Sequence, residues 1–184
     1  METAAVKFRA KDMAYIAVFT ALLAVCAWIS VPMPWGVSYT LQTMGVFLAV
    51  GVLGGKRGTL AVLVYLLLGA VGVPVFSGFR GGAAALLGTT GGYIAGFLFS
   101  ALVMWAMERL LGKKLTVLAL SMVVGLAVCY AFGTAWYMVV YTQSSGPVAL
   151  GTVLGWCVTP FILPDLVKIA LALLLTARLR PYVK

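Results

Sequence analysis

Residues 13–55 read MAYIAVFTALLAVCAWISVPMPWGVSYTLQTMGVFLAVGVLGG and contain no charged side chain. A helix that crosses the roughly 30 Å hydrocarbon core of a bilayer needs about 20 mostly apolar residues, so this run is too long for a single crossing. It contains a helix-breaking segment, VPMPWG at 31–36, which holds two prolines and a glycine. The run therefore predicts two membrane-spanning helices, at 12–30 and 39–55, joined by a short turn.

The rest of the chain divides in the same way. Lys56 and Arg57 follow the second span, a third span is expected at 58–73, and a fourth at 88–108. Residues 115–164 form another long uncharged run, which the polar turn TQSSGP at 142–147 divides. Two further spans, at 115–141 and 152–177, follow from this division. We therefore expect an all-α integral membrane protein with six transmembrane helices in a single membrane domain, 1–184.

The composition also indicates a membrane protein. Hydrophobic residues make up 64 % of the 184 residues and charged residues only 9 %, and the mean hydropathy is +1.12. So few charges cannot cover the surface of a water-soluble domain, whereas a disordered chain would need low hydrophobicity and a high net charge. These values exclude both classes.

The basic residues gather on one side of the predicted membrane helices. The chain has 13 Lys and Arg against 4 Asp and Glu, which gives a net charge of +9. An even number of spans places both termini on one side, and that side would hold eleven of the 13 basic residues: Lys7, Arg9, Lys11, Lys56, Arg57, Arg109, Lys113, Lys114, Arg178, Arg180 and Lys184. Because Lys and Arg concentrate in cytoplasmic loops, this predicts that both termini lie inside (N-in/C-in). No basic stripe with interleaved aromatic residues remains to indicate nucleic-acid binding.

Residue types that enzymes and metal sites commonly use are scarce. The chain has no histidine, and its three cysteines, Cys26, Cys129 and Cys157, lie in apolar stretches without C-x-x-C spacing. The four acidic residues are scattered along the chain. We therefore expect no metal site, no disulfide framework, no cofactor and no enzymatic activity. The phosphate loop G-x-x-x-x-G-K-[ST] is also missing, so any energy from ATP would come from another subunit.

Asp165 and Lys168 are charged residues inside the predicted sixth span. A charge in a membrane segment costs several kcal/mol unless it faces a polar cavity or a partner, so such a residue indicates a functional site. A spacing of three places both side chains on one helix face, where they can pair and can offer an acceptor and a donor to a polar ligand. Pro160 and Pro164 interrupt the helix just outside the pair. The alternative interpretation is an ion pair that only locks helix packing.

Arg80 lies in the predicted outward connection SGFRGG at 77–82. We expect this segment to act as a lid, because its glycines allow it to approach a ligand or to hinge, and an arginine at the mouth of a site can clamp a carboxylate. A solvated loop arginine is the alternative. In the first span, Ala17 and Ala21 form a small-x-x-x-small pair that permits close helix contact. Aromatic residues near predicted span ends, among them Tyr39 and Tyr137, are expected to anchor at the membrane interface.

Six segments together resemble the BioY family, the biotin-specific substrate-binding (S) components of energy-coupling factor (ECF) transporters. They are YTLQTMGV at 39–46, LGGKRG at 53–58, LLLGAVGVPVF at 66–76, FRGG at 79–82, TGGY at 90–93 and PFILPDLVK at 160–168. The resemblance implies an S-component fold in the cytoplasmic membrane of a bacterium or archaeon. It also implies capture of biotin and docking onto a transmembrane coupling subunit with two ATPases, with Ala17 and Ala21 as the docking motif.

The chemistry of biotin suggests roles for the residues already singled out. Asp165 would accept an N–H of the ureido ring and Lys168 would donate to its carbonyl, although an ammonium also suits the carboxylate, so the orientation stays open. Arg80, with Tyr93 or Gln42, would hold the carboxylate or close the lid. The complete set of expected substrate-binding residues is Asp165, Lys168, Arg80, Phe79, Tyr93, Gln42 and Thr90.

Two other functions fit the same residues. One is a stand-alone facilitator for biotin or a similar small acid, which would need no ATPase. The other is a structural membrane protein in which Asp165 and Lys168 merely hold helices together. Co-purification with ATPase subunits separates the importer from the facilitator, and ligand binding separates both from the structural protein.

Overall fold

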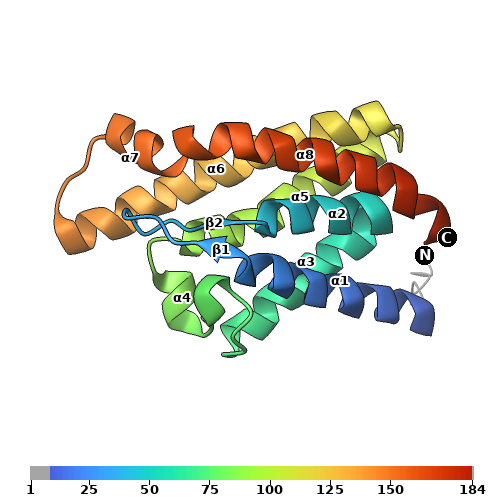
Figure 1. Cartoon of the computed structure of the whole chain (residues 1–184), viewed down its shortest axis with the longest axis horizontal. Coiled ribbons are helices and arrows are strands. Elements are labelled where there is room, and N and C mark those ends of the chain that lie inside the picture. The colour runs from blue at the N-terminus through green and yellow to red at the C-terminus, as the bar shows by residue number, and fades with distance from the viewer. Residues whose placement is uncertain (1–8, 184) are drawn as a thin grey trace, which may run out of the picture.

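The computed structural model describes residues 9–183 and consists mostly of helices that run along the long axis of the molecule (Figure 1). The longer helices are α1 (Ala10–Trp28), α2 (Gln42–Leu53), α3 (Gly55–Ala70), α5 (Gly91–Leu111), α6 (Leu115–Ser145), α7 (Leu150–Cys157) and α8 (Thr159–Leu179). The start of α1 and the end of α8 lie at the same end of the molecule. Lys7 and Lys184, which enter the predicted charge distribution, lie outside the described residues.

Within residues 9–183, four helical stretches are long and apolar enough to cross a membrane: α1, α5, α6 and Leu150–Tyr182. Their outer faces expose large apolar side chains, such as Val18, Leu102 and Leu174, as expected of surfaces that face lipid. The core between the helices includes seven fully buried large side chains: Leu23, Val46, Phe47, Tyr65, Phe76, Met104 and Met122. The chain is thus a mostly helical membrane protein.

Helices α2 and α3 correspond to the second and third predicted spans. With 12 residues α2 is shorter than its predicted span, whereas α3 has the predicted 16 residues but begins three residues earlier. They meet at Gly54, whose φ of +83° is a conformation that favours glycine, and this residue makes the tight turn. Lys56 and Arg57 follow the second helix as expected, but α3 begins at Gly55 and includes both of them in its first turn. Helix α3 begins directly after the turn because Gly54 alone reverses the chain.

The last predicted span, 152–177, is divided in the structure. Val158, with φ −124° and ψ −58°, separates α7 from α8. Pro160 follows in the first turn of α8, where its missing N–H costs nothing, and Pro164 lies inside that helix. The break thus lies two residues before Pro160, where the helix was expected to be interrupted, whereas Pro164 does not end α8.

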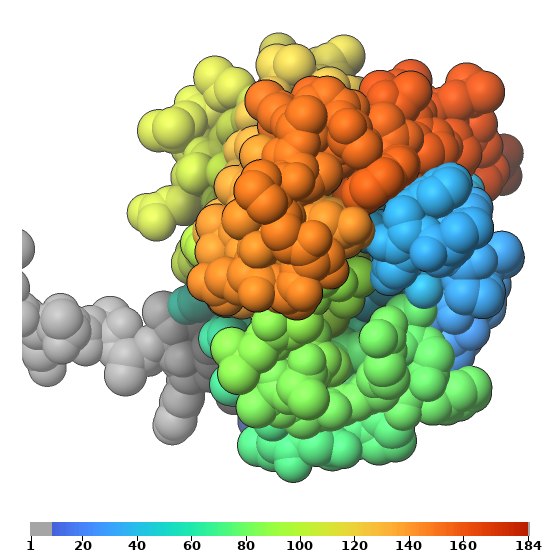
Figure 2. Space-filling model, turned by 90° about the vertical axis from the view of Figure 1, so that its left-hand side faces the viewer, coloured from blue at the N-terminus to red at the C-terminus, as the bar shows by residue number. Residues whose placement is uncertain are grey.

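Two short connections cover the end of the molecule opposite to the termini. A hairpin of two-residue strands, β1 (Ser30–Val31) and β2 (Tyr39–Thr40), joins α1 to α2, although the sequence predicted no strand there. The predicted glycine-rich connection contains a 3₁₀ turn, Ser77–Phe79, and the short helix α4 (Ala83–Leu87). In Figure 2 the hairpin loop (blue), the α4 region (green) and the α6–α7 connection (orange) meet on this end face.

Candidate functional site

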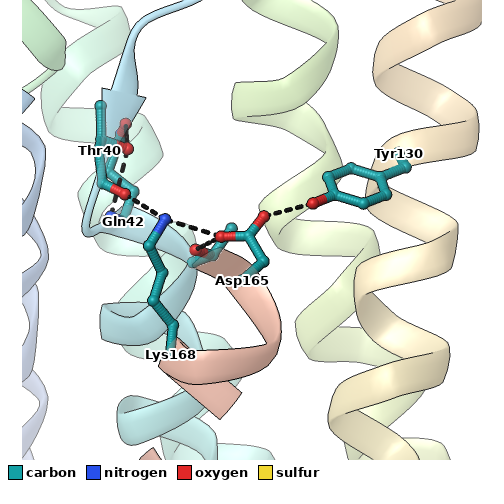
Figure 3. A network of polar contacts seen from close by, with 6 residues as sticks. Thr40, Gln42, Tyr130, Asp165 and Lys168 are labelled. Carbon is teal, nitrogen blue, oxygen red and sulfur yellow. Dashed lines mark hydrogen bonds and ion pairs between the residues drawn. The ribbon is translucent and has the colours of Figure 1, made fainter. Parts of the chain in front are cut away.

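Asp165 and Lys168 lie one turn apart on α8 and face the interior of the helix assembly (Figure 3). The Lys168 Nζ atom lies 2.7 Å from Asp165 Oδ1, and the two residues are only 2 % and 4 % exposed. A buried charge is strongly unfavourable unless it is paired and hydrogen-bonded, and this pair satisfies that condition. The predicted spacing of three residues therefore does place both groups on one inward face.

Residues of three further elements form hydrogen bonds with the pair. Asp165 accepts hydrogen bonds from the hydroxyl of Thr43 on α2, at 3.0 Å, and from that of Tyr130 on α6, at 2.5 Å. Lys168 donates to the carbonyl oxygen of Thr40 in β2, at 2.6 Å. The charge pair thus connects α2, α6, α8 and the hairpin at one point.

Tyr39 is a contact of the site and not only an interfacial anchor. The Lys168 Nζ atom lies 4.1 Å from the centre of the Tyr39 ring, close enough for a cation–π interaction. The other predicted anchor, Tyr137, is 2 % exposed, and its hydroxyl donates to the carbonyl of Trp35 at 2.9 Å. These two contacts join the loop that includes β2 to α8 and α6.

Gln42 belongs to a second buried polar group beside the charge pair. Its side-chain Nε2 donates to the Tyr65 hydroxyl at 2.7 Å, and its Oε1 accepts from the Thr40 hydroxyl at 2.9 Å. Tyr65 in turn donates to the carbonyl of Val75 at 3.1 Å. This chain of hydrogen bonds fixes the Gln42 amide and links the start of α2 to the segment that leads into the predicted lid.

Most of the predicted substrate-binding residues line one cavity, at the end of the molecule opposite to the termini. Its wall contains Asp165, Lys168, Gln42, Arg80, Tyr93 and Thr90, six of the seven expected substrate-binding residues. Apolar and weakly polar side chains form much of the rest: Val37, Phe76, Ala85, Ile94, Phe97, Cys129, Cys157 and Phe161. Small-molecule sites commonly combine an apolar wall with a few fixed polar groups, and this cavity has that character.

Arg80 and Ser77 lie at the exposed side of the cavity. The Arg80 Nε atom donates to the backbone carbonyl of Ser77 at 3.1 Å, and Arg80 is exposed. The Ser77 hydroxyl is buried on the cavity wall, and it has no hydrogen-bond partner among the described residues. A buried hydroxyl without a partner is unfavourable, so it is available to a polar ligand.

Phe79 is the predicted binding residue that does not reach the cavity. It is 64 % exposed, and its ring stacks on Trp28 with a centroid distance of 5.2 Å. A positive φ of 57° at Phe79 turns its side chain to the outside of the lid, whereas the neighbouring Arg80 lines the cavity. Adjacent residues in a turn need not share a side, and the sequence alone did not separate them.

Ala17 and Ala21 lie away from this cavity, on the exposed side of α1. Together with Val25, Leu68 and Val73 they line an apolar groove between α1 and the end of α3. The small-x-x-x-small pair therefore forms part of an accessible surface. Within residues 9–183, no group of three or more His, Cys, Asp or Glu side chains is placed to hold a metal ion.

Sequence reasoning missed two direct partners of Asp165, Thr43 and Tyr130. Each had a signal, because Thr43 is polar within an apolar run and Tyr130 lies near the middle of a span rather than at its end. Their partner could not be read from the sequence, since Thr43 and Tyr130 are 122 and 35 residues away from Asp165.

Comparisons with known proteins agree on one family. A family model described as the BioY family matches residues 1–184. A biotin transporter BioY of Thermotoga maritima is 42 % identical over 163 residues, covering 89 % of this chain and 92 % of the relative. A probable biotin transporter BioY of Pyrococcus horikoshii is 41 % identical over 175 residues, covering 94 % and 98 %. The crystal structure of an S-component for biotin from an ECF-type ABC transporter matches with a TM-score of 0.80 and 30 % identity, covering 93 % of this chain and 91 % of the other.

Proposed function

This chain belongs to the BioY family, and from that premise we propose that it is the high-affinity biotin-binding S component of an ECF-type importer. It delivers biotin to the cytoplasm, and separate ATPase subunits hydrolyse ATP. The observation that carries the proposal is the buried Asp165–Lys168 pair in the wall of a largely apolar cavity. A charged pair at this depth offers both hydrogen-bond directions to an uncharged polar group.

We assign the ureido ring of biotin to the Asp165–Lys168 end of the cavity. Asp165 accepts a ureido N–H and Lys168 donates to the ureido carbonyl, while the apolar wall receives the thioether ring and the valerate chain. The carboxylate then extends toward Arg80, whose guanidinium is the exposed cation of the cavity wall. Gln42, Thr90 and Tyr93 line the path between the two ends, and the proposal needs no cofactor.

We also propose six membrane crossings with both termini inside, in the cytoplasmic membrane of a bacterium or archaeon. The described basic residues support this orientation, because Lys56, Arg57, Arg109, Lys113 and others gather at the end that holds the start of α1 and the end of α8. The cavity is then at the outward end. Helix α2, at about 18 Å, completes its crossing together with the hairpin segment before it.

The partners in this proposal are a transmembrane coupling subunit and two ATPases. Ala17 and Ala21 support the docking role because they are exposed in an apolar groove, where the absence of long side chains lets another helix approach closely.

Titration calorimetry with biotin tests the binding function on the purified, detergent-solubilised protein. We expect one-to-one binding of biotin, none of riboflavin or thiamine, and a loss of about 30-fold or more for Asp165→Asn and for Lys168→Ala. Removing one partner of a buried pair costs about 2–5 kcal/mol, which is at least that factor.

Asp12→Asn is the matched control, because Asp12 pairs with Arg57 at the opposite end, at 3.1 Å, and its loss should leave affinity unchanged. No binding of biotin by folded wild-type protein would reject the proposal and favour the structural alternative. Biotin binding without co-purifying ATPase subunits would favour the facilitator.

A further inference from the structure

A second cavity lies between helix ends at the end of the molecule opposite to the binding cavity. It is lined by the first turns of α1 and α3 and by the end of α5 and the loop after it. Its side chains include four cations and two acids: Lys56, Arg57, Arg109, Lys113, Asp12 and Glu108. The cavity therefore has an excess of positive charge.

Both acids are already engaged within the protein. Asp12 pairs with Arg57 at 3.1 Å. Glu108 accepts the backbone N–H of Gly55, which occupies its carboxylate at the start of α3, and it also lies 3.6 Å from Lys113 Nζ and 3.9 Å from Arg180 Nη2. The carboxylates of both acids are therefore engaged by groups other than Arg109.

Arg109 stands out among these cations. It is exposed in the last turn of α5, and its side chain has no hydrogen-bond or ion-pair partner within residues 9–183. Trp105, one turn earlier on the same helix, lines the same cavity and packs directly against Gly55. An aromatic wall beside an unpaired guanidinium suits a ligand that joins an anionic group to apolar chains.

We infer that this cavity binds the phosphodiester headgroup of an anionic phospholipid, with Arg109 as its main cationic contact. The inference rests on the membrane orientation in the proposed function, which places the cavity at the cytoplasmic surface of the bilayer. Basic pockets between helices on that side attract anionic headgroups. A lipid is favoured over a soluble anion because the cavity opens among helix ends at headgroup depth, where such lipids are always present.

Lipid retention measured by native mass spectrometry tests the inference, with the full chain in detergent micelles containing phosphatidylglycerol or phosphatidylcholine. We expect the wild type to retain phosphatidylglycerol in preference to phosphatidylcholine. Arg109→Gln should lower its apparent affinity about fivefold, which is about 1 kcal/mol for one basic residue at the membrane surface. Arg109→Lys should restore much of it.

Arg178→Gln is the matched control, because Arg178 is also an exposed arginine in a last helical turn, has no partner in the described part of the chain, and lies outside the cavity. Its lipid retention should equal that of the wild type. Equal loss in both arginine variants would show a general charge effect and overturn the inference.

Two further arms fix the source of the anion. Inorganic phosphate and glycerol 1-phosphate should give no Arg109-dependent rise in thermal stability. Such a rise would overturn the lipid assignment and indicate that the cavity binds a soluble phosphate. Unchanged lipid retention in Arg109→Gln, with loss of assembly with the coupling subunit, would assign the cavity to a protein partner and overturn the inference. Biotin titration of the same variants reports separately on the proposed function, since lipid retention is measured without biotin.

Discussion

Single residues around the cavity decide how much of it is available to a ligand. Ser77 is informative because its buried hydroxyl lacks a partner and because it precedes Arg80 in the lid. A hydroxyl that is desolvated without a hydrogen bond destabilises the protein, and a ligand that pairs with it removes that cost. The Ser77 hydroxyl is therefore expected to lower the stability of the ligand-free protein and to strengthen ligand binding.

We expect Ser77→Ala to weaken biotin binding by about 2- to 10-fold, the net worth of one hydrogen bond. The same change should leave thermal stability without biotin unchanged or raise it, because it deletes an unsatisfied group. Calorimetry and thermal unfolding on one preparation measure both effects. Ser144→Ala, whose hydroxyl bonds to backbone on the exposed end of α6, is the control. Unaltered affinity in Ser77→Ala would exclude a ligand contact there.

The charged residues of the site were predictable from the sequence, whereas their partners were not. Asp165 and Lys168 stand out because charges are rare and costly inside a span. Tyr130 and Thr43 carry ordinary polar groups, and only the packing of α6 and α2 against α8 reveals what they bind. Phe79 was predicted to bind the ligand but does not line the cavity, because one backbone angle in a loop decides on which side of the lid its ring lies.

At the scale of elements, the helices were predicted to within a few residues wherever apolar runs end at charges or prolines. The predicted span 115–141 corresponds to α6, and 88–108 to α5. Two short features were not predicted fully: the two-residue strands carry no periodic signal, and the last span was expected as one helix although Pro160 follows two residues after the break at Val158. The strands form because Ser30 pairs with Thr40 and Val31 with Tyr39, and two-residue segments are too short to reveal such pairing in the sequence.

The crossing of α2 and α3 depends on the absence of a side chain at Gly58. A Cβ atom built there would lie 2.4 Å from the Val50 Cα atom, so backbone would have to move. We expect Gly58→Ala to destabilise the protein by about 1–3 kcal/mol, seen as a lower midpoint of thermal unfolding in detergent. Gly155→Ala in α7 is the control, because nothing lies within 4 Å of its Cβ position.

An alanine in an open helical position should be neutral or slightly stabilising. If Gly58→Ala were as stable as Gly155→Ala, the close contact between α2 and α3 would not exist in the native protein.

At the scale of the whole molecule, the two ends differ in chemistry. One end holds the cavity lined by Asp165 and Lys168, and the other holds the cavity lined by Lys56, Arg57 and Arg109. The second of these ends is the one where α1 begins and α8 ends (Figure 1). By the positive-inside rule, this difference supports the proposed orientation with both termini inside, which requires an even number of crossings.

Cysteine labelling in intact cells measures that orientation. In a chain whose native cysteines are replaced, Ser145→Cys at the exposed end of α6 should react with a membrane-impermeant maleimide from outside. Lys114→Cys, at the start of the same helix, should react only after the cells are permeabilised. The reverse pattern would invert the topology, and labelling of both sites in intact cells would exclude α6 as a single crossing.

The contacts of the charge pair do not use its full hydrogen-bonding capacity. A carboxylate has about four acceptor positions and an ammonium three protons. Asp165 uses three positions, on Thr43, Tyr130 and Lys168, and Lys168 uses two protons, on Asp165 and Thr40. One acceptor position remains, and the third proton has no hydrogen bond, with the Tyr39 ring 4.1 Å from the Lys168 Nζ atom. A ureido group, with its N–H and C=O side by side, saturates both, whereas an analogue that offers two donors or two acceptors leaves one of them unmatched.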